Sequence, residues 1–426
     1  MKFINKIEFS GQIWGCPDGA NMLALADRVS AGRPFVYVAR DDLRMMAMRD
    51  ALSLLVPQAE LLVLPAWDCL PFDRLSPQGS LVGQRIETLA RLRGLIPNPY
   101  NVPDPSAPDN HTPDKAPKTK NKDTSTPPTV LLTTVNAFIQ RVPPQSYFVN
   151  SALSLSPGDE IGPAGLASFL GNLNYLRTDT VRETGEFAVR GGIVDIFPPG
   201  SPTPVRLDFF GDELETIRSF DAASQRGGEK SPQMTLRPVA EFQLDAETIE
   251  RFRSGYLVTF GAQASRDSLY ESVSAGRMHP GMEHWLPLFH ANLDTVSDYC
   301  PDWHIYLDHE ADGAIAARFD QIMDFHQARY ESDTGDGSAP YRPLPADQLY
   351  LRREEAESQL ASACRLFQFA ASSPGRAKTG DAGGRAPVGL SGDGHGDGGG
   401  CTSIGSRRTV ETQRPTLWQP LPLHGV

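Results

Sequence analysis

The feature of this sequence that most restricts its fold is the alternation of short apolar runs with helix-patterned stretches over residues 1–100. The runs FVYVAR and LLVLP have the composition of buried strands, and LRMMAMRDALSLL and SLVGQRIETLARLRGL have the spacing of amphipathic helices. Such alternation is typical of a parallel sheet covered by helices. Because TVLLTTVNAFIQRV at 129–142 continues the pattern, we expect the first part of an α/β domain in residues 1–150.

The pattern changes twice further along the chain. Residues 151–238 consist of short strand-like runs between glycines and prolines, which predicts an inserted α+β domain. A mixed pattern then returns, with GYLVTF and HIYLDHE predicted as strands and AIAARFDQIMDFHQARY as a helix. We therefore assign residues 239–372 to the second part of the α/β domain and the start of a linker.

Two segments have no apolar periodicity. Residues 101–128 are rich in Pro, Lys, Asp and Thr, which predicts a disordered surface loop because such a segment cannot bury enough apolar surface to offset its ordering entropy. Residues 373–426 begin SPGRAKTGDAGGRAP and are predicted to be a disordered tail. The abrupt change of composition near Ser373 suggests a tail that is out of frame with the preceding chain.

Composition argues against several functional classes. No run approaches the roughly 18 apolar residues of a membrane span, and MKFINKIEFSGQ lacks the apolar core of a signal peptide, so we expect a cytoplasmic protein without a membrane partner. The net charge of -12 disfavours nucleic acid as the main ligand, because phosphate binding requires clustered Lys and Arg. The five cysteines form no CxxC pair, which predicts neither a disulfide framework nor a zinc site, and we expect no bound metal.

The turn after the first predicted strand is where an α/β domain of this kind would hold a nucleotide. A phosphate-binding loop requires GxxxxGK[ST], whose backbone N–H groups, Lys and hydroxyl hold phosphates and magnesium. In IWGCPDGANM, Gly15 and Gly19 keep the turn. Ala20 and Asn21, however, stand where Lys and Ser or Thr are needed, and Asp18 adds a repelling charge. We therefore predict a non-functional cradle, no enzyme activity in this chain and no cofactor.

Acids after a predicted strand form a weaker candidate site. HIYLDHE resembles an apolar strand that ends in the acids of a metal-holding motif. Without a nucleotide cradle, Asp308 and Glu310 are predicted to be a solvated strand end. His304 and His309 lack the spacing of a zinc site.

The insert carries the most informative side chains. In VRLDFF a two-residue period places Leu207 and Phe209 on one face of a strand and Arg206 and Phe210 on the other. In EFAVRGG the same rule places Arg190 away from the apolar face. If the two strands are neighbours, Arg190, Arg206 and Phe210 form one patch of the residue types enriched in binding hot spots.

A second interpretation stays open at this point. The arginines could pair with nearby acids such as Asp208 or Glu186 on a solvated face that binds nothing, and spacing alone does not separate the two interpretations. Residues 151–250 contain 16 acidic and 8 basic side chains, a net charge of -8. That balance suits a protein partner better than DNA.

The same stretches resemble a known family. GEFAVRGGIVDIFPPGS followed by PVRLDFFGDELETIRSFDAASQR closely resembles the module that bacterial transcription-repair coupling factors (Mfd) share with the excision-repair protein UvrB. Further motifs resemble the N-terminal region of that family in the same order, namely LPAWDCLPFDRLSPQGSLVGQRIETLARL, TTVNAFIQRVPP, HPGMEHWLPLF and YRPLPADQLYL. The resemblance extends from residue 1 to about residue 370.

The resemblance implies a degenerate helicase-type (RecA-like) α/β domain without a phosphate-binding loop, split by a domain that binds UvrA. By motif position, the UvrA contacts of the family fall on Arg190, Arg206 and Phe210. The implied function is recruitment of nucleotide excision repair, through UvrA, to RNA polymerase stalled at a DNA lesion. Polymerase and DNA contacts, and the motor that uses ATP and magnesium, belong in the family to domains that this sequence is expected to lack. The competing hypothesis is half of a helicase-related ATPase or a module that binds damaged DNA.

Overall fold

The computed structural model describes residues 12–13, 17–94, 128–331 and 341–368. Gly15, nearly all of the loop predicted at 101–128 and the tail predicted from residue 373 lie outside the described residues. The predictions of disorder made for those segments therefore stay predictions.

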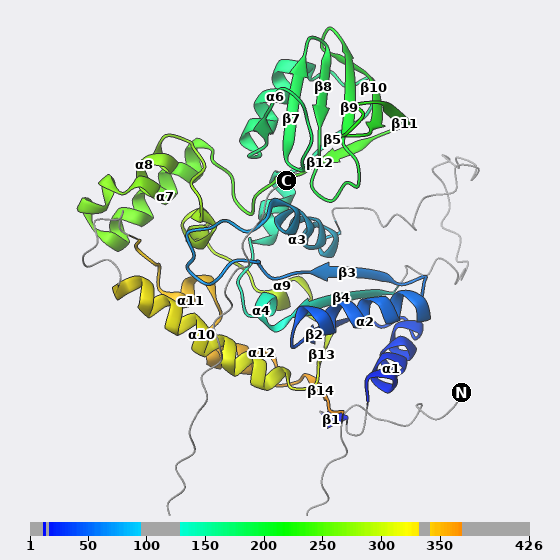
Figure 1. The fold of residues 1–426 in the computed structure, drawn as a ribbon, viewed down its shortest axis with the longest axis vertical. Helices are drawn as coiled ribbons and strands as arrows, with labels where there is room; N and C mark the ends of the chain where they lie inside the picture. Colours follow the sequence, from blue (N-terminus) through cyan, green and yellow to red (C-terminus); the bar gives the residue numbers. More distant parts are fainter. Residues whose placement is uncertain (1–11, 14–16, 95–127, 332–340, 369–426) are drawn as a thin grey trace, which may run out of the picture. The chain divides into compact units, whose positions relative to one another are not determined.

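A six-stranded sheet, parallel at every pairing, forms the centre of the α/β domain (Figure 1). Its strands are, in order across the sheet, β1 (Gln12–Ile13), β14 (Cys364–Leu366), β13 (His304–Leu307), β2 (Phe35–Ala39), β4 (Thr129–Thr134) and β3 (Glu60–Leu64). Strands from before and after the insert thus lie side by side in one sheet. This confirms the predicted parallel α/β class and the strands expected in FVYVAR, LLVLP, TVLLTT and HIYL.

Helices cover both faces of this sheet. On one face, α1 (Asp18–Ser30) and α2 (Asp42–Leu55) bury apolar side chains against β2 and β4. On the other face, α3 (Gly79–Leu92), α4 (Val135–Phe138) and α10 (Ala311–Glu331) contribute to a larger core. Each fully buried Leu, Ile or Phe contributes roughly 1.5–3 kcal/mol, which explains why the strands are apolar on both faces.

Shorter elements complete the α/β domain. They are α5 (Gln145–Asn150), η1 (Ala262–Arg266), α8 (Ser268–Ser274), η2 (Met282–Leu288), α9 (Val296–Tyr299), α11 (Ala346–Leu349) and α12 (Arg353–Gln359).

No helix in the described ranges combines the length and the apolar character needed to cross a bilayer.

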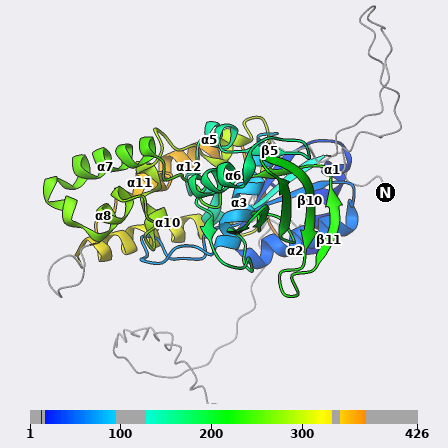
Figure 2. The same cartoon turned by 90° about the horizontal axis from the view of Figure 1, so that it is seen from above.

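One strand prediction is wrong. GYLVTF is the last part of helix α7 (Ala246–Phe260), which packs against α8 (Figure 2). Asp245 and Thr248 form a capping box that starts the helix. Phe252 and Tyr256, four residues apart, are buried on one face with their rings stacked 5.2 Å apart. Tertiary packing therefore overrides the strand preference of the β-branched and aromatic run.

The insert is a second sheet with one helix on it. Its strands, in order across the sheet, are β11 (Gly227–Ser231), β10 (Glu213–Phe220), β9 (Val205–Phe210), β8 (Ile193–Ile196), β7 (Glu186–Arg190) and β6 (Leu176–Arg177). All pairs are antiparallel except β6 with β7. Helix α6 (Gly162–Asn172) and the ribbon of β5 (Leu153–Leu155) with β12 (Met234–Leu236) bury one face of this sheet. The opposite face is available for other contacts.

Candidate partner-binding face

The strand alternation predicted for the insert is present. Leu207 is fully buried and Phe209 is 9% exposed, both in the core beneath α6, whereas Phe210 is 75% exposed. Phe187 is buried in the same core, and Arg190 at the end of its strand is exposed. The arginine side of the sheet is therefore the side that α6 leaves uncovered.

A pair of glycines brings Arg190 close to β9. Gly191 has φ of +60°, in the left-handed region that favours glycine. A Cβ on Gly192 would lie 2.8 Å from the carbonyl oxygen of Phe209, and the Phe209 N–H donates to the Gly192 carbonyl at 2.7 Å. Only glycine permits this approach, which fixes the turn between β7 and β8 against β9.

The strand register places the three predicted residues on one face. Across the sheet, Asp195 on β8 is directly opposite Arg206 on β9, and Arg190 on β7 is opposite Ile193 on β8. Phe210 follows Arg206 by four residues on β9 and so points to the same side. We call this set, Arg190, Ile193, Asp195, Arg206 and Phe210, the arginine face. Whether it binds a partner stays a prediction.

A buried carboxylate that sequence reasoning missed holds the arginines. The Nε and Nη2 atoms of Arg206 donate to the two oxygens of Asp195 at 2.6 and 2.9 Å, and this hydrogen bonding raises the pKa of Arg206. The Asp195 side chain is only 1% exposed. Arg190 lies 3.9 Å from the same carboxylate and donates to the Asp179 carbonyl at 2.9 Å.

Internal pairing therefore occurs, but not with the acids considered from the sequence. Asp208 accepts from Arg218 at 2.9 Å and from Thr216 at 2.6 Å. Glu186 accepts from the backbone N–H groups of Arg182 and Glu183. The acid that pairs with Arg206 lies on the neighbouring strand, directly opposite it.

Arg206 is held on a second side by an aromatic ring. Its guanidinium lies 4.8 Å from the centroid of Phe220, which belongs to a small cluster with Val181 and Ala188. The carboxylate and the ring together restrict the rotamer of Arg206, whose side chain is 20% exposed. Its Nη1 donors make no hydrogen bond to any group in the described part of the chain. The guanidinium is thus oriented before any partner arrives.

Ile193 is the second exposed apolar side chain of the face. It is 37% exposed, next to Arg190 across the hairpin. The two-residue period of GGIVDI places Ile193 and Asp195 together, opposite the buried Val194 and Ile196. The sequence therefore contained the signal for both missed residues.

The insert matches a known protein family. Residues 153–242 match the model of the UvrB interaction domain. Almost the whole insert thus resembles the UvrB interaction domain.

The chain as a whole is similar to the N-terminal region of transcription-repair-coupling factors. It is 31% identical to that of Escherichia coli over 352 residues, which cover 82% of this chain and 27% of the relative. The corresponding protein of Haemophilus influenzae is 29% identical over 350 residues, with the same coverage. That of Mycobacterium bovis is 33% identical over 247 residues, or 56% of this chain and 18% of the relative. The chain thus spans about a quarter of the length of these relatives.

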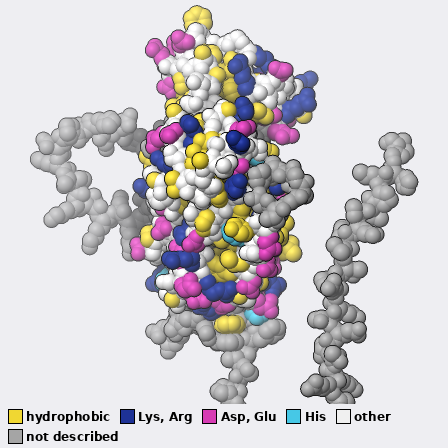
Figure 3. Space-filling view, turned by 90° about the vertical axis from the view of Figure 1, so that its left-hand side faces the viewer, with side chains coloured by type: hydrophobic (Ala, Val, Ile, Leu, Met, Phe, Trp, Pro, Cys, Tyr) yellow, Lys and Arg dark blue, Asp and Glu magenta, His cyan; other side chains and the backbone are white. Residues whose placement is uncertain are grey.

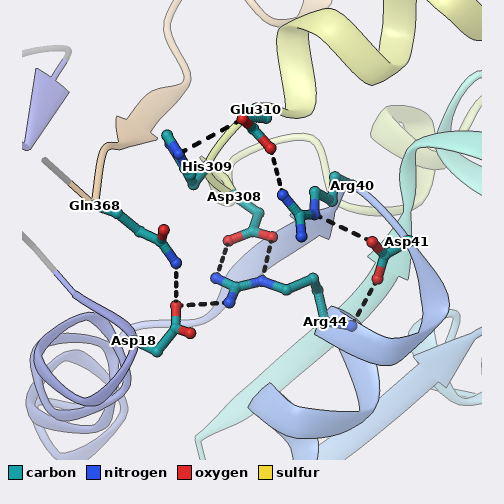
Figure 4. A network of polar contacts seen from close by, with 8 residues as sticks. All are labelled: Asp18, Arg40, Asp41, Arg44, Asp308, His309, Glu310 and Gln368. Carbon is teal, nitrogen blue, oxygen red and sulfur yellow. Dashed lines mark hydrogen bonds and ion pairs between the residues drawn. The ribbon is translucent and has the colours of Figure 1, made fainter.

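Outside the UvrB interaction domain, the candidate nucleotide cradle is occupied by internal ion pairs (Figure 4). Arg44 on α2 donates to both oxygens of Asp308, at 2.9 and 2.7 Å, and to Asp18 at the start of α1, at 2.6 Å. These hydrogen bonds raise the pKa of Arg44, and they hold the pKa of Asp18 below its usual range. The carboxylates at this edge of the sheet are therefore paired with arginines of the protein itself.

The prediction that the acids after β13 are exposed to solvent is wrong for Asp308 and confirmed for Glu310. The Asp308 side chain is fully buried beneath Arg44, whereas that of Glu310 is 62% exposed and pairs with Arg40. A buried carboxylate requires a partner, and Arg44 supplies it from a position 264 residues away in the chain.

The other described residues of the candidate cradle are Gly19, Ala20 and Asn21. Asn21 is 1% exposed, and its Oδ1 has no hydrogen-bond partner in the described residues. Gly19 has open space at its Cβ position, so its lack of a side chain is not required by packing. Ala20 is partly buried against the core between α1 and the sheet. A neutral amide and a methyl group stand where a lysine and a hydroxyl would be needed.

Proposed function

We propose that this chain docks onto UvrA through the arginine face of its UvrB interaction domain. In this proposal it is the N-terminal part of a transcription-repair coupling factor and recruits nucleotide excision repair to RNA polymerase stalled at a DNA lesion. The match at 153–242 and the similarity to transcription-repair-coupling factors support it. The single observation that carries it is the 75% exposed Phe210 on the same face as a pre-oriented Arg206.

The geometry of the face defines the partner surface that would fit. Arg206 uses Nε and Nη2 on Asp195, so a partner carboxylate would approach its Nη1 side. Arg190, 48% exposed, offers a second donor. Phe210 and Ile193 would fill an apolar depression between those carboxylates. Charge-assisted hydrogen bonds around a buried aromatic anchor are the common form of a binding hot spot.

We further propose that this chain alone hydrolyses no ATP. Arg44 occupies the space beside Asp308, where a working site would place magnesium, and no lysine follows the turn before α1. The surface view supports a protein partner over nucleic acid, because on the face drawn in Figure 3 basic and acidic side chains are interspersed and form no continuous basic patch.

Calorimetric titration of the chain with purified UvrA tests this proposal. We expect saturable binding that weakens about tenfold or more in Arg190→Glu, since the change places a negative charge against the partner's acids. Glu247→Gln on α7, whose side chain is 80% exposed, is the matched control and should bind like the parent. Absence of heat with UvrA, or saturable micromolar binding of a labelled ATP, would argue for the helicase-related alternative.

A further inference from the structure

A pocket of about 170 Å³ lies in the α/β domain, away from the arginine face. Its walls are largely apolar and come from three parts of the chain, with Trp67, Pro77, Val82, Val239 and Met278 among them. Two carboxylates, those of Glu241 and Glu283, line the same pocket. Apolar walls with a few convergent polar groups are typical of a ligand site.

Glu241 brings an unpaired acceptor to this pocket. Its Oε1 accepts from Arg85 Nε at 2.6 Å, and its side chain is 1% exposed. Arg85 also donates from Nη1 to the Pro65 carbonyl at 2.7 Å. No hydrogen-bond donor in the described ranges reaches Glu241 Oε2. A buried acceptor without a donor is unfavourable, so a ligand that supplies a donor here would bind more tightly than one that does not.

Glu283 adds a second negative charge. The residue is 8% exposed, and its Oε2 accepts from Ser76 Oγ at 2.7 Å. Burial raises its pKa, and the charge of Glu241 raises it further. Among the residues that line the pocket there is no basic side chain, and Glu241 is paired with Arg85. The pocket is thus lined by two acidic side chains and by no cation.

We propose that this pocket binds an organic cation on a short apolar stem, the chemistry of an arginine or lysine side chain. Its N–H donors would bond Glu241 Oε2 and Glu283, and its stem would lie against Trp67 and Met278. A metal ion fits less well, because in the part of the chain that the structure describes no three His, Cys, Asp or Glu side chains converge. The proposal is independent of UvrA docking.

The test uses the full chain labelled with ¹⁵N and the indole N–H resonance of Trp67, one of five tryptophans, assigned by its loss in Trp67→Phe. Titration with n-butylguanidinium should shift this resonance saturably, and the neutral isostere n-butylurea should not. A blocked Gly-Arg-Gly peptide that gives the same shift would show that a side chain of a partner protein can enter. Its failure, with n-butylguanidinium binding retained, would restrict the site to free small cations.

Two pocket variants test whether Glu283 and the region around Met278 take part in n-butylguanidinium binding. Glu283→Gln keeps an acceptor for Ser76 and should weaken n-butylguanidinium binding about tenfold, because one charge-assisted bond is lost. Met278→Lys, at a position 49% exposed, places a competing cation at the pocket mouth and should do the same without disturbing the fold. Glu250→Gln, 67% exposed on α7, should bind like the parent. The proposal is overturned if no saturable shift occurs, if n-butylurea produces the same shift, or if both pocket variants bind like the parent.

Discussion

At the scale of single residues, Asp195 decides how the arginine face is presented. It is the buried acid that pairs with Arg206, directly opposite it in the strand register, and it lies 3.9 Å from Arg190. Alternation in the sequence predicts which residues share this face. It cannot predict the stacking of Arg206 on Phe220, or the bond from Arg190 to the Asp179 carbonyl, because those contacts depend on how separate strands and a loop pack.

Asp195→Asn should therefore weaken UvrA binding without removing any side chain that touches the partner. The amide keeps the shape but loses the charge that orients Arg206, and we expect about tenfold weaker binding with a loss of about 2 kcal/mol in the free energy of unfolding. Calorimetry and denaturant unfolding measure the two effects. Asp312→Asn, whose side chain is 54% exposed and pairs with Arg365 in the α/β domain, is the control. Unchanged affinity in Asp195→Asn would show that the orientation of Arg206 is irrelevant to docking.

On strand β9, truncation of a buried side chain should lower the free energy of unfolding, whereas truncation of an exposed one should not. Leu207 is fully buried, so Leu207→Ala should lower the free energy of unfolding by about 2–5 kcal/mol through lost apolar burial and a cavity. Phe210→Ala should leave it within about 0.5 kcal/mol, because the ring is 75% exposed. Urea denaturation of both variants checks this. Similar stability losses in the two would contradict the assignment of faces.

At the scale of elements, the sequence predicts four strands of the parallel sheet and the helices α2, α3 and α10, but not the end of α7 or the two shortest strands. Strongly apolar runs identify β2, β3, β4 and β13. A strand buried on both faces has apolar residues at consecutive positions, so it can be recognised in the sequence. The end of α7 is missed because its aromatic residues are fixed by tertiary packing. Strands β1 and β14, of two and three residues, are too short to leave a pattern.

The ion pair that links α2 to the end of β13 has a testable energetic role. Arg44→Ala leaves the Asp308 carboxylate buried and unpaired, so we expect the free energy of unfolding to fall by about 3 kcal/mol. Replacing both partners, as in Arg44→Met with Asp308→Leu, should recover most of that loss, since apolar residues of similar size often substitute for a buried pair. A double variant as unstable as Arg44→Ala in urea denaturation would contradict this account. Neither variant should gain ATP hydrolysis.

At the scale of the whole molecule, two buried histidines make the free energy of unfolding depend on pH. Burial lowers the pKa of His284 and of His290 from 6.5 to about 4. Between about pH 4 and 6.5 the unfolded chain binds more protons at these sites than the folded chain, so stability falls as the pH falls through this window. We expect the free energy of unfolding to decrease by a few kcal/mol from pH 7 to pH 4.5.

Urea denaturation across that pH range measures the effect. His290→Asn should reduce the slope of stability against pH, because one of the two titrating groups is removed. His304→Asn, at an exposed residue, is the matched control and should leave the slope unchanged. An identical slope in His290→Asn and the parent would show that other groups control the pH dependence.

The two domains have separate roles in this account. The parallel sheet has ion pairs at its carboxyl edge, and the insert presents an exposed face with two arginines and an aromatic ring. The net charge of -12 disfavours nucleic acid as the main ligand but cannot identify a protein partner. That identification depends on a handful of side chains whose arrangement is set by strand register.

The affinity of Phe210→Ala for UvrA tests the central claim most directly. Phe210 is exposed, makes no contribution to the insert core and can be truncated without disturbing the fold. Leu54→Ala on α2, at a leucine 82% exposed in the other domain, is the matched control. We predict that calorimetry shows about thirtyfold weaker binding, a loss of about 2 kcal/mol, for Phe210→Ala and none for Leu54→Ala. Equal affinities of Phe210→Ala, Leu54→Ala and the parent, with all three folded, would contradict docking through the arginine face.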